Sequence, residues 1–239
     1  MASEPIVIQR EWDFRALHDA WPSGMDNKYI LKRLGTVPVE ITAKGAHGPV
    51  LEVAAAEAIH SCKLALRGLR TVVLEPSPAM LERARERMAE FGAQIELVRG
   101  IAETLPFADG TFDRVLIESA IDHLADPALG VREMTRVLAP EGRLLIGFVN
   151  YGSPNVRLSR LYYGIARALG RAWSRQHLFW DSPVPAEHTF ECTFTRIRRL
   201  CGPHLELDQA HGVSIGWAFP GWGEWLSRQP EHRAYRIVH

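Results

Sequence analysis

Titratable side chains that could move a proton gather just after one predicted strand. Glu118, Asp122 and His123 lie close together in the segment ESAIDH. Histidine has the side-chain pKa closest to neutral pH, so His123 is the best candidate general base, with Asp122 beside it. The alternative is that Asp122 and His123 only start or support the next helix. His188, in AEHTFECTF, is another candidate base or substrate ligand, against a surface or helix-capping role.

Two further acids lie at the ends of predicted strands in the first half of the chain. Glu52 belongs to the run PVLEV, and Glu75 ends the run TVVLE, 23 residues later. Directly after Glu52 comes VAAAEAIHS, with alanine at positions 54, 55, 56 and 58. Nucleotide-binding turns normally carry glycine at such positions, because glycine permits positive φ and close approach of the backbone to a ligand.

Five short apolar runs predict the strands that would position these acids. Branched apolar residues without polar alternation are typical of buried parallel strands. The runs are PVLEV (49–53), TVVLE (71–75), QIELV (94–98), RVLIES (114–119) and RLLIGFV (143–149).

Helical patterns fill the gaps between these strands. The segment SPAMLERARERMAEFG has Ser77 as N-cap, Pro78 in the first turn and Gly92 just past the end. The segment DPALGVREMTRVLAPEG repeats this arrangement, with Asp126 as cap and PEG as the stop. The alternation predicts an α/β fold with a doubly wound, mostly parallel sheet, which binds ligands at the carboxyl ends of its strands.

Residues 45–150 closely resemble the class I S-adenosylmethionine-dependent methyltransferases. The segment GIAETLPFADGTFD (100–113) is very similar to the family pattern G-D-A-E-x-L-P-F-x-D-x-x-F-D. The segment SAIDHLADPALGVREMTRVLAPEGRLLI resembles the family's stretch from strand four to strand five. In place of the family's E/D-x-G-x-G-x-G, this chain has LEVAAAEA, which keeps Glu52. A dinucleotide-binding fingerprint is excluded because G-x-G-x-x-G is absent.

The resemblance implies a seven-stranded-type, Rossmann-like methyltransferase fold. It implies S-adenosylmethionine as cofactor, S-adenosylhomocysteine as product, and no metal. In the family the acid after strand two, here Glu75, takes the ribose hydroxyls, and the acid that commonly contacts adenine is replaced here by Ile101. The residues expected around the cofactor are Glu52, Ala54, Ala56, Glu75, Pro76, Ile101, Ala102 (through its backbone amide), Glu103 and Glu118.

The same resemblance divides the chain into three parts. We expect an N-terminal helical cap at 1–44, a cofactor-binding α/β core at 45–150, and an acceptor-binding insertion with the C-terminal part of the sheet at 151–239. In the family the loop after strand four often contacts the acceptor. The resemblance therefore also favours Asp122 and His123 as residues that contact the acceptor. Trp12, Trp21 and Tyr29 in the cap are expected to close the pocket or to pack in the core.

The expected function is transfer of a methyl group from S-adenosylmethionine to an oxygen or nitrogen of a small molecule. The alternative is a degenerate or repurposed member, or a sequence altered to block binding, with weak or no cofactor binding. Alanine forced to positive φ costs about 1–2 kcal/mol, and each added methyl can intrude on the methionyl group. Two such penalties would weaken binding about 100-fold. The loop could instead rearrange, with the next helix beginning early and closing the turn, because alanine is the best helix former.

Charge and cysteine content argue against several other classes of protein. A formal net charge of zero argues against a nucleic-acid binder. The three cysteines, Cys62, Cys192 and Cys201, have no paired spacing, which argues against a disulfide framework and a zinc site and favours a reducing compartment. With no apolar run near about 18 residues, we expect a soluble, cytoplasmic protein of undetermined oligomeric state.

The last part of the chain differs in charge from the first. Residues 151–239 carry 11 Lys and Arg against 7 Asp and Glu, whereas residues 1–150 carry 17 against 21. No acid occurs from 151 to 177. This predicts an anionic or apolar small-molecule acceptor, or weak membrane-surface contact through 157–175, against the alternative of a solvated arginine face. The arginines on one predicted helical face are Arg160, Arg167, Arg171 and Arg175, and the apolar side consists of Leu158, Leu161, Tyr162, Ile165 and Leu169.

Overall fold

The computed structural model describes residues 32–170, 189, 191–212, 225–226 and 228–238. The chain divides into two compact units, and each is described by itself. Among the described residues, the first unit contains Pro38–Phe148 and Leu200–Leu205, and the second continues the chain from Val149. The expected N-terminal helical cap, with Trp12, Trp21 and Tyr29, lies almost entirely outside the described residues.

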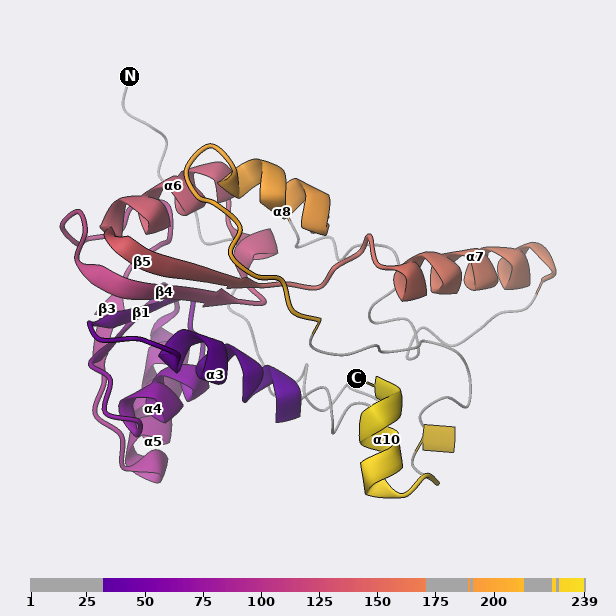
Figure 1. Cartoon of the computed structure of the whole chain (residues 1–239), viewed down its shortest axis with the longest axis horizontal. Helices are drawn as coiled ribbons and strands as arrows, with labels where there is room; N and C mark the ends of the chain where they lie inside the picture. The colour runs from indigo at the N-terminus through magenta and orange to yellow at the C-terminus, as the bar shows by residue number, and fades with distance from the viewer. Residues whose placement is uncertain (1–31, 171–188, 190, 213–224, 227, 239) are drawn as a thin grey trace. The chain divides into compact units, whose positions relative to one another are not determined.

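The first unit is built on a parallel sheet of five strands in the order β3-β2-β1-β4-β5 (Figure 1). β1 and β2 are buried along their whole length, as their unbroken apolar runs predict. The strands are β1 (Val50–Val53), β2 (Thr71–Glu75), β3 (Glu96–Arg99), β4 (Phe112–Glu118) and β5 (Leu138–Gly147).

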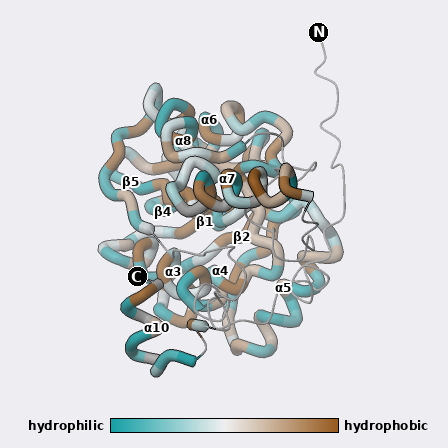
Figure 2. The backbone as a smooth tube through the Cα atoms, turned by 90° about the vertical axis from the view of Figure 1, so that its right-hand side faces the viewer, coloured by the Kyte–Doolittle hydropathy of each residue, from teal (hydrophilic) through white to brown (hydrophobic). Residues whose placement is uncertain are grey.

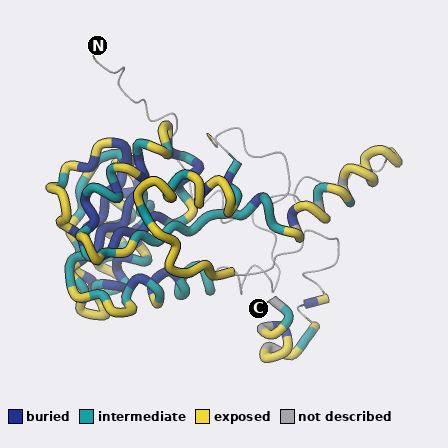
Figure 3. Tube along the Cα trace, turned by 45° about the horizontal axis from the view of Figure 1, so that its top comes forward, coloured by how far each residue is buried: buried dark blue, intermediate teal, exposed yellow. Residues whose placement is uncertain are grey.

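Helices cover both faces of this sheet. In Figure 1, α3 (Val37–Ala43), α4 (Ile59–Ala65) and α5 (Pro78–Phe91) lie on one side, and α6 (Pro127–Val137) lies on the other. Figure 3 shows the buried residues of this unit gathered in its interior. The predicted α/β fold class, a doubly wound parallel sheet, is confirmed, with five strands among the described residues.

The caps of α5 and α6 follow the sequence prediction. The Ser77 side chain accepts a hydrogen bond from the Met80 backbone N–H, and Gly92 ends α5 in the left-handed conformation with φ of 64°. Asp126 caps α6 by accepting from the backbone N–H groups of Ala128 and Leu129. Each cap satisfies donors that the first turn of a helix leaves without an intrahelical partner.

The start of β5 differs from the prediction. The PEG segment, predicted as a helix stop, lies inside β5, which begins at Leu138 rather than at Arg143. The pairing with β4 passes from Phe112–Leu138 to Arg114–Arg143, so the register shifts there and the intervening residues of β5 have no partner in β4. Periodicity alone does not reveal such a shift.

Further elements of the described chain are helices. They include the 3₁₀ helix η1 (Ile121–His123), α7 (Pro154–Ala168), α8 (Phe194–Cys201) and α10 (Glu231–Val238). Within the described ranges, no helix is both long and apolar enough to cross a membrane.

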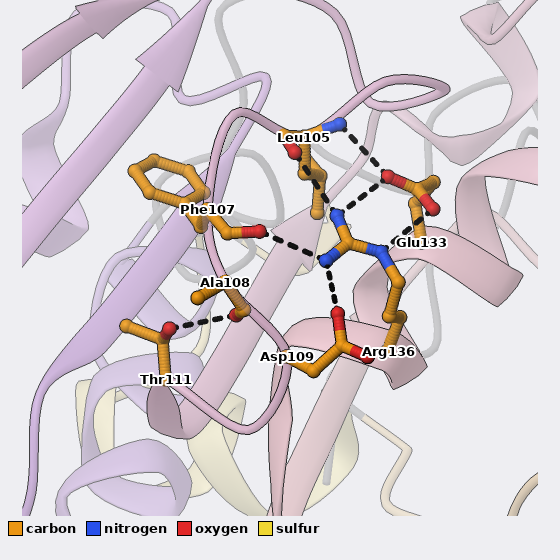
Figure 4. Close-up of polar contacts among 7 residues, drawn as sticks. All are labelled: Leu105, Phe107, Ala108, Asp109, Thr111, Glu133 and Arg136. Atoms are coloured by element: carbon orange, nitrogen blue, oxygen red, sulfur yellow. Dashed lines mark hydrogen bonds and ion pairs between the residues drawn. The ribbon is translucent and has the colours of Figure 1, made fainter.

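The loop before β4 is fixed by one arginine of α6 (Figure 4). The Arg136 guanidinium donates to the backbone oxygens of Leu105 (3.0 Å) and Phe107 (2.8 Å) and pairs with Asp109 (2.6 Å) and Glu133 (2.8 Å). Glu133 in turn accepts from the Leu105 N–H at 3.1 Å. The hydrogen bonds from Arg136 lower the pKa of Glu133, so both partners stay charged. Much of the motif LPFADG therefore acts as scaffold.

We expect Arg136→Met to lower the free energy of unfolding by about 2 kcal/mol, because two backbone carbonyls and two carboxylates lose a charged donor. Urea denaturation measures this. Arg136→Lys is the matched control: it keeps the charge but cannot form the planar, multiple hydrogen bonds, so its loss should be intermediate. Equal stability of all three proteins would show that the network is not stabilising.

Candidate functional site

Three carboxylates meet at the edge of the sheet where the strands end. Glu52 lies in β1, Glu75 ends β2 and Glu118 ends β4, and these strands are neighbours in the sheet. The carboxyl ends of parallel strands lie at one edge, which is where such sheets bind ligands. The negative charge of Glu52 raises the pKa of both Glu75 and Glu118, although burial contributes more to each.

The alanine loop after β1 adopts the backbone that glycine usually provides. Ala54, Ala56 and Ala58 have φ of 53°, 48° and 57°, in the left-handed region. The helix α4 begins only at Ile59, after Ala58. The alternative that the helix begins early and closes the turn is therefore wrong. The left-handed alanines persist because surrounding residues fix the loop through long-range contacts.

Glu52 connects the strand to the helix on the far side of this loop. Its carboxylate accepts hydrogen bonds from the Ser61 backbone N–H at 2.9 Å and from the Ser61 hydroxyl. The His60 Nδ1 lies 2.9 Å from the other Glu52 oxygen. Glu52 is buried, so these contacts compensate for the loss of its hydration. Both of its carboxylate oxygens contact residues of α4. We infer that the main role of Glu52 is to hold the loop in place, and that ligand contact is secondary.

Glu75 fixes the middle of the loop from the next strand. Its Oε2 accepts from the Ala56 N–H and its Oε1 from the Ser77 N–H, both at 2.9 Å. Burial raises the pKa of Glu75, and these two backbone donors oppose that rise. Each oxygen accepts one backbone hydrogen bond, which leaves acceptor capacity for a ligand hydroxyl.

The loop is also tied to α5. The largely buried Glu57 forms ion pairs with Arg83 at 3.3 Å and with Arg87 at 2.8 Å. Ala58 is fully buried and packs in a core cluster with Val73 and Ala84. Its methyl group is therefore part of the core, and the expectation that every alanine methyl would intrude on a ligand does not hold for Ala58. Ala54 and Ala56 are only partly buried.

This geometry changes where the cost of the alanines falls. Each left-handed alanine costs about 1–2 kcal/mol. The loop already has the left-handed backbone without a ligand. The conformational cost therefore lowers the stability of the fold and does not weaken ligand binding. The methyl groups of Ala54 and Ala56 are the part of the substitution that can weaken binding.

Glu118 occupies space that only a glycine leaves open. It pairs with Gly147 of β5, and a Cβ at Gly147 would lie 1.5 Å from the Glu118 Oε2. The Ser119 hydroxyl donates to the Glu118 Oε1 at 3.1 Å, and Ser119 has a positive φ of 53°. Burial raises the pKa of Glu118, whereas His60 and the Ser119 hydroxyl lower it.

A cleft opens beside Glu75, where β2 and β3 end. Its volume is about 390 Å³, within the range of small-molecule sites. Pro76 and Ile101, both predicted cofactor contacts, line it. Arg99 also lines it and donates to the Pro76 carbonyl at 3.3 Å. The full set of lining residues is Pro76, Arg99, Gly100, Ile101, Thr104 and Pro106.

The other predicted residues fall into three groups. Ala102 and Glu103 are buried, and the Glu103 carboxylate accepts from the backbone N–H groups of Ala125 and Asp126, which is a scaffold contact. Asp122 and His123 lie in η1, with the His123 Nε2 4.0 Å from the Asp122 Oδ1. Asp122 is buried and His123 is partly exposed. His188 lies outside the described residues.

The sequence reasoning missed His60. It contacts Glu52 directly, and its charge lowers the pKa of Glu118, so it interacts electrostatically with two of the three acids. The sequence did contain an indication of this role, because His60 lies in the first turn of the helix after β1, close to the end of that strand. The described residues contain no group of three or more His, Cys, Asp or Glu side chains placed to bind a metal ion.

Comparison with known proteins shows what the sheet-forming part of the chain is similar to. Residues 51–146 match the model of a methyltransferase domain. A demethylmenaquinone methyltransferase of Clavibacter sepedonicus is 35% identical over 116 residues, which are 48% of this chain and 46% of that protein. The ubiquinone/menaquinone biosynthesis C-methyltransferase UbiE of Klebsiella pneumoniae is 35% identical over 96 residues, 39% and 38% of the two chains. The match thus spans less than half of each relative.

The fold comparison extends over more of the chain. A Bacillus halodurans protein described as a methyltransferase superposes with a TM-score of 0.60 over 85% of this chain and 87% of its own, at 20% identity. At that identity the likeness shows the fold alone.

We expect Ala56→Gly to raise the free energy of unfolding by about 1 kcal/mol, because glycine adopts positive φ without a Cβ penalty. Ala58→Gly should change stability little, since the same relief is offset by about 0.8 kcal/mol for the buried methyl that is lost. Chemical denaturation of both variants measures the difference. A destabilising Ala56→Gly would contradict the strained loop.

Glu118→Gln should stabilise the protein more at about pH 8 than at about pH 5. The raised pKa of Glu118 means that the folded state holds its proton more tightly, so stability falls as pH rises above the ordinary carboxyl pKa. Melting temperatures at the two pH values measure this. The exposed Glu141→Gln is the control, for which little difference is expected; the same pH dependence in both variants would exclude burial of Glu118 as the cause.

Proposed function

We propose that this chain, whose residues 51–146 match the model of a methyltransferase domain, binds S-adenosylmethionine and transfers its methyl group to a small molecule, as the class I S-adenosylmethionine-dependent methyltransferases do. One observation carries the proposal: alanines 54, 56 and 58 keep the left-handed backbone of a glycine-rich turn. Because Glu52, Glu75 and Glu57 hold this backbone without a ligand, the loop already has the conformation that a bound cofactor would need.

The residues at the sheet edge fit the parts of this cofactor. Glu75 has acceptor capacity left for the ribose hydroxyls, and Pro76 and Ile101 offer apolar contact for the adenine in the cleft. The loop 54–58 would lie along the methionyl part, where the Ala54 and Ala56 methyl groups reduce the available space. When bound, the cofactor supplies an electrophilic methyl group on its sulfonium.

His123 and Asp122 are the candidates for proton transfer. We assign His123 as the base that takes the proton from an acceptor O–H or N–H at an imidazole nitrogen, with Asp122 stabilising the charged ring. His188 remains a candidate base or acceptor ligand, and Glu118 remains a candidate cofactor contact. An oxygen or nitrogen acceptor is proposed because a neighbouring base is useful when the attacking atom carries a proton.

The acceptor is assigned only as a small molecule. The two curated relatives are named for menaquinone and ubiquinone biosynthesis, but the chain covers less than half of either, so their acceptors are not carried over. We assign acceptor selection to residues 151–239, because a second compact unit continues the chain from Val149.

The absence of a disulfide among the three cysteines supports a reducing, cytoplasmic location.

A second candidate is a repurposed member that uses the fold without methyl transfer. Two observations favour it: the partly accessible methyl groups of Ala54 and Ala56, and Ile101 in place of the family's adenine-binding acid. In that case the cleft would take another ligand, and the strained loop would be a remnant.

Calorimetric titration with S-adenosylmethionine and S-adenosylhomocysteine separates the two candidates. We expect measurable binding to this chain, and about tenfold tighter binding to Ala56→Gly, equivalent to about 1.4 kcal/mol for one removed methyl group. Ala58→Gly is the matched control, whose affinity should not change because that methyl lies in the core.

The outcomes have distinct meanings. No binding to any of the three proteins would overturn the methyltransferase proposal and favour the repurposed member. Tight binding to Ala56→Gly alone would show an intact pocket closed by one methyl group. Equal tightening by Ala58→Gly would show that loop strain, rather than space, limits affinity.

A further inference from the structure

The largest apolar side chains of α7 are exposed. The exposed fractions are 49% for Leu158, 61% for Leu161 and 53% for Ile165, and Leu169, just past the helix, reaches 72%. Their spacing of three, four and four residues places them on one helical face. Figure 3 shows α7 as mostly exposed, and Figure 2 shows hydrophobic positions recurring along it.

The buried residues of α7 lie on a different face. Val156 and Ala166 are buried, and Arg160 is held within the second unit by Glu191 at 3.2 Å and by the Tyr151 ring, 5.6 Å from its centroid. The helix therefore packs through a small face, while its larger apolar face is left open. This differs from the sequence-based alternative, in which only an arginine face is solvated.

The charge of α7 is positive. Arg157 and Arg167 are exposed, and neither forms an ion pair with another residue that the structure describes. At 100° per residue, Arg157 borders the apolar face beside Leu161, whereas Arg167 lies on the opposite side of the helix. No Asp or Glu occurs between residues 151 and 177, so nothing nearby in the sequence offsets these cations.

We propose that the apolar face of α7, formed by Leu158, Leu161, Ile165 and Leu169, binds the surface of an anionic lipid bilayer. A helix that lies in the interface inserts its apolar face between acyl chains and directs basic side chains to the headgroups. An anionic bilayer complements both properties of α7, because it offers an apolar layer beneath a layer of negative charge. The four side chains span about 16 Å along the helix at 1.5 Å per residue, enough for a continuous contact.

Co-sedimentation of the full chain with vesicles tests this proposal. The vesicles contain phosphatidylcholine alone, or phosphatidylcholine and phosphatidylglycerol in equal parts. We expect binding only to the anionic vesicles, weaker at high salt. Arg157→Glu/Arg167→Glu and Leu161→Ser/Ile165→Ser should each weaken binding about tenfold or more.

Two matched variants serve as controls. Arg70→Glu/Arg85→Glu makes the same charge change at exposed arginines outside α7, and Leu66→Ser/Leu207→Ser removes exposed leucines elsewhere. Neither should weaken vesicle binding. Equal losses in the controls would overturn the proposal in favour of general electrostatic attraction, and no binding to either vesicle would overturn it outright.

Other occupants of the same face give different results. A second copy of the chain would appear as a dimer in sedimentation velocity without lipid, lost in Leu161→Ser/Ile165→Ser. Coverage by the chain itself would appear as a large fall in melting temperature for that variant. Either result would overturn the bilayer proposal.

Discussion

The carboxylates of Glu52 and Glu75 hold a run of alanines in a backbone that alanine disfavours, and the candidate site depends on this. Glu75 accepts from the Ala56 N–H in the middle of the loop, and Glu52 accepts from Ser61 where α4 begins. Glu57 adds ion pairs to α5. With these contacts on three sides, the loop cannot relax into an extended helix without leaving buried acids without their donors, which costs more than the strain.

This arrangement separates stability from binding. The conformational cost of Ala54, Ala56 and Ala58 belongs to the folded chain, because the left-handed backbone is present without a ligand. Ala58 recovers part of that cost by packing against Val73 and Ala84. What remains to oppose a ligand is the volume of two partly accessible methyl groups, a smaller and more local effect than the loss of three glycines suggests.

The residues that most resemble a family motif are not all contacts for a cofactor. In the segment 100–113, Leu105, Phe107 and Asp109 are bound by Arg136, and Glu103 accepts from the backbone before α6. Ile101 and Thr104 line the cleft. The motif thus combines a scaffold, which fixes the loop to α6, with a few positions that face the site, and resemblance alone does not separate the two.

The sequence by itself determined the alternation of strands and helices in the sheet-forming part of the chain, and which acids lie at the strand ends. Caps such as Ser77 and Asp126, and unbroken apolar runs such as β2, act over a few residues, so their structure can be inferred locally. Only the tertiary structure decided that the alanine loop keeps positive φ, that His60 contacts Glu52, that the Ala58 methyl enters the core, and that the apolar face of α7 is exposed. Each of these depends on contacts between residues distant in the chain, such as Ala56 with Glu75 and Glu57 with Arg87, and local propensity favours a helix where those contacts impose a turn.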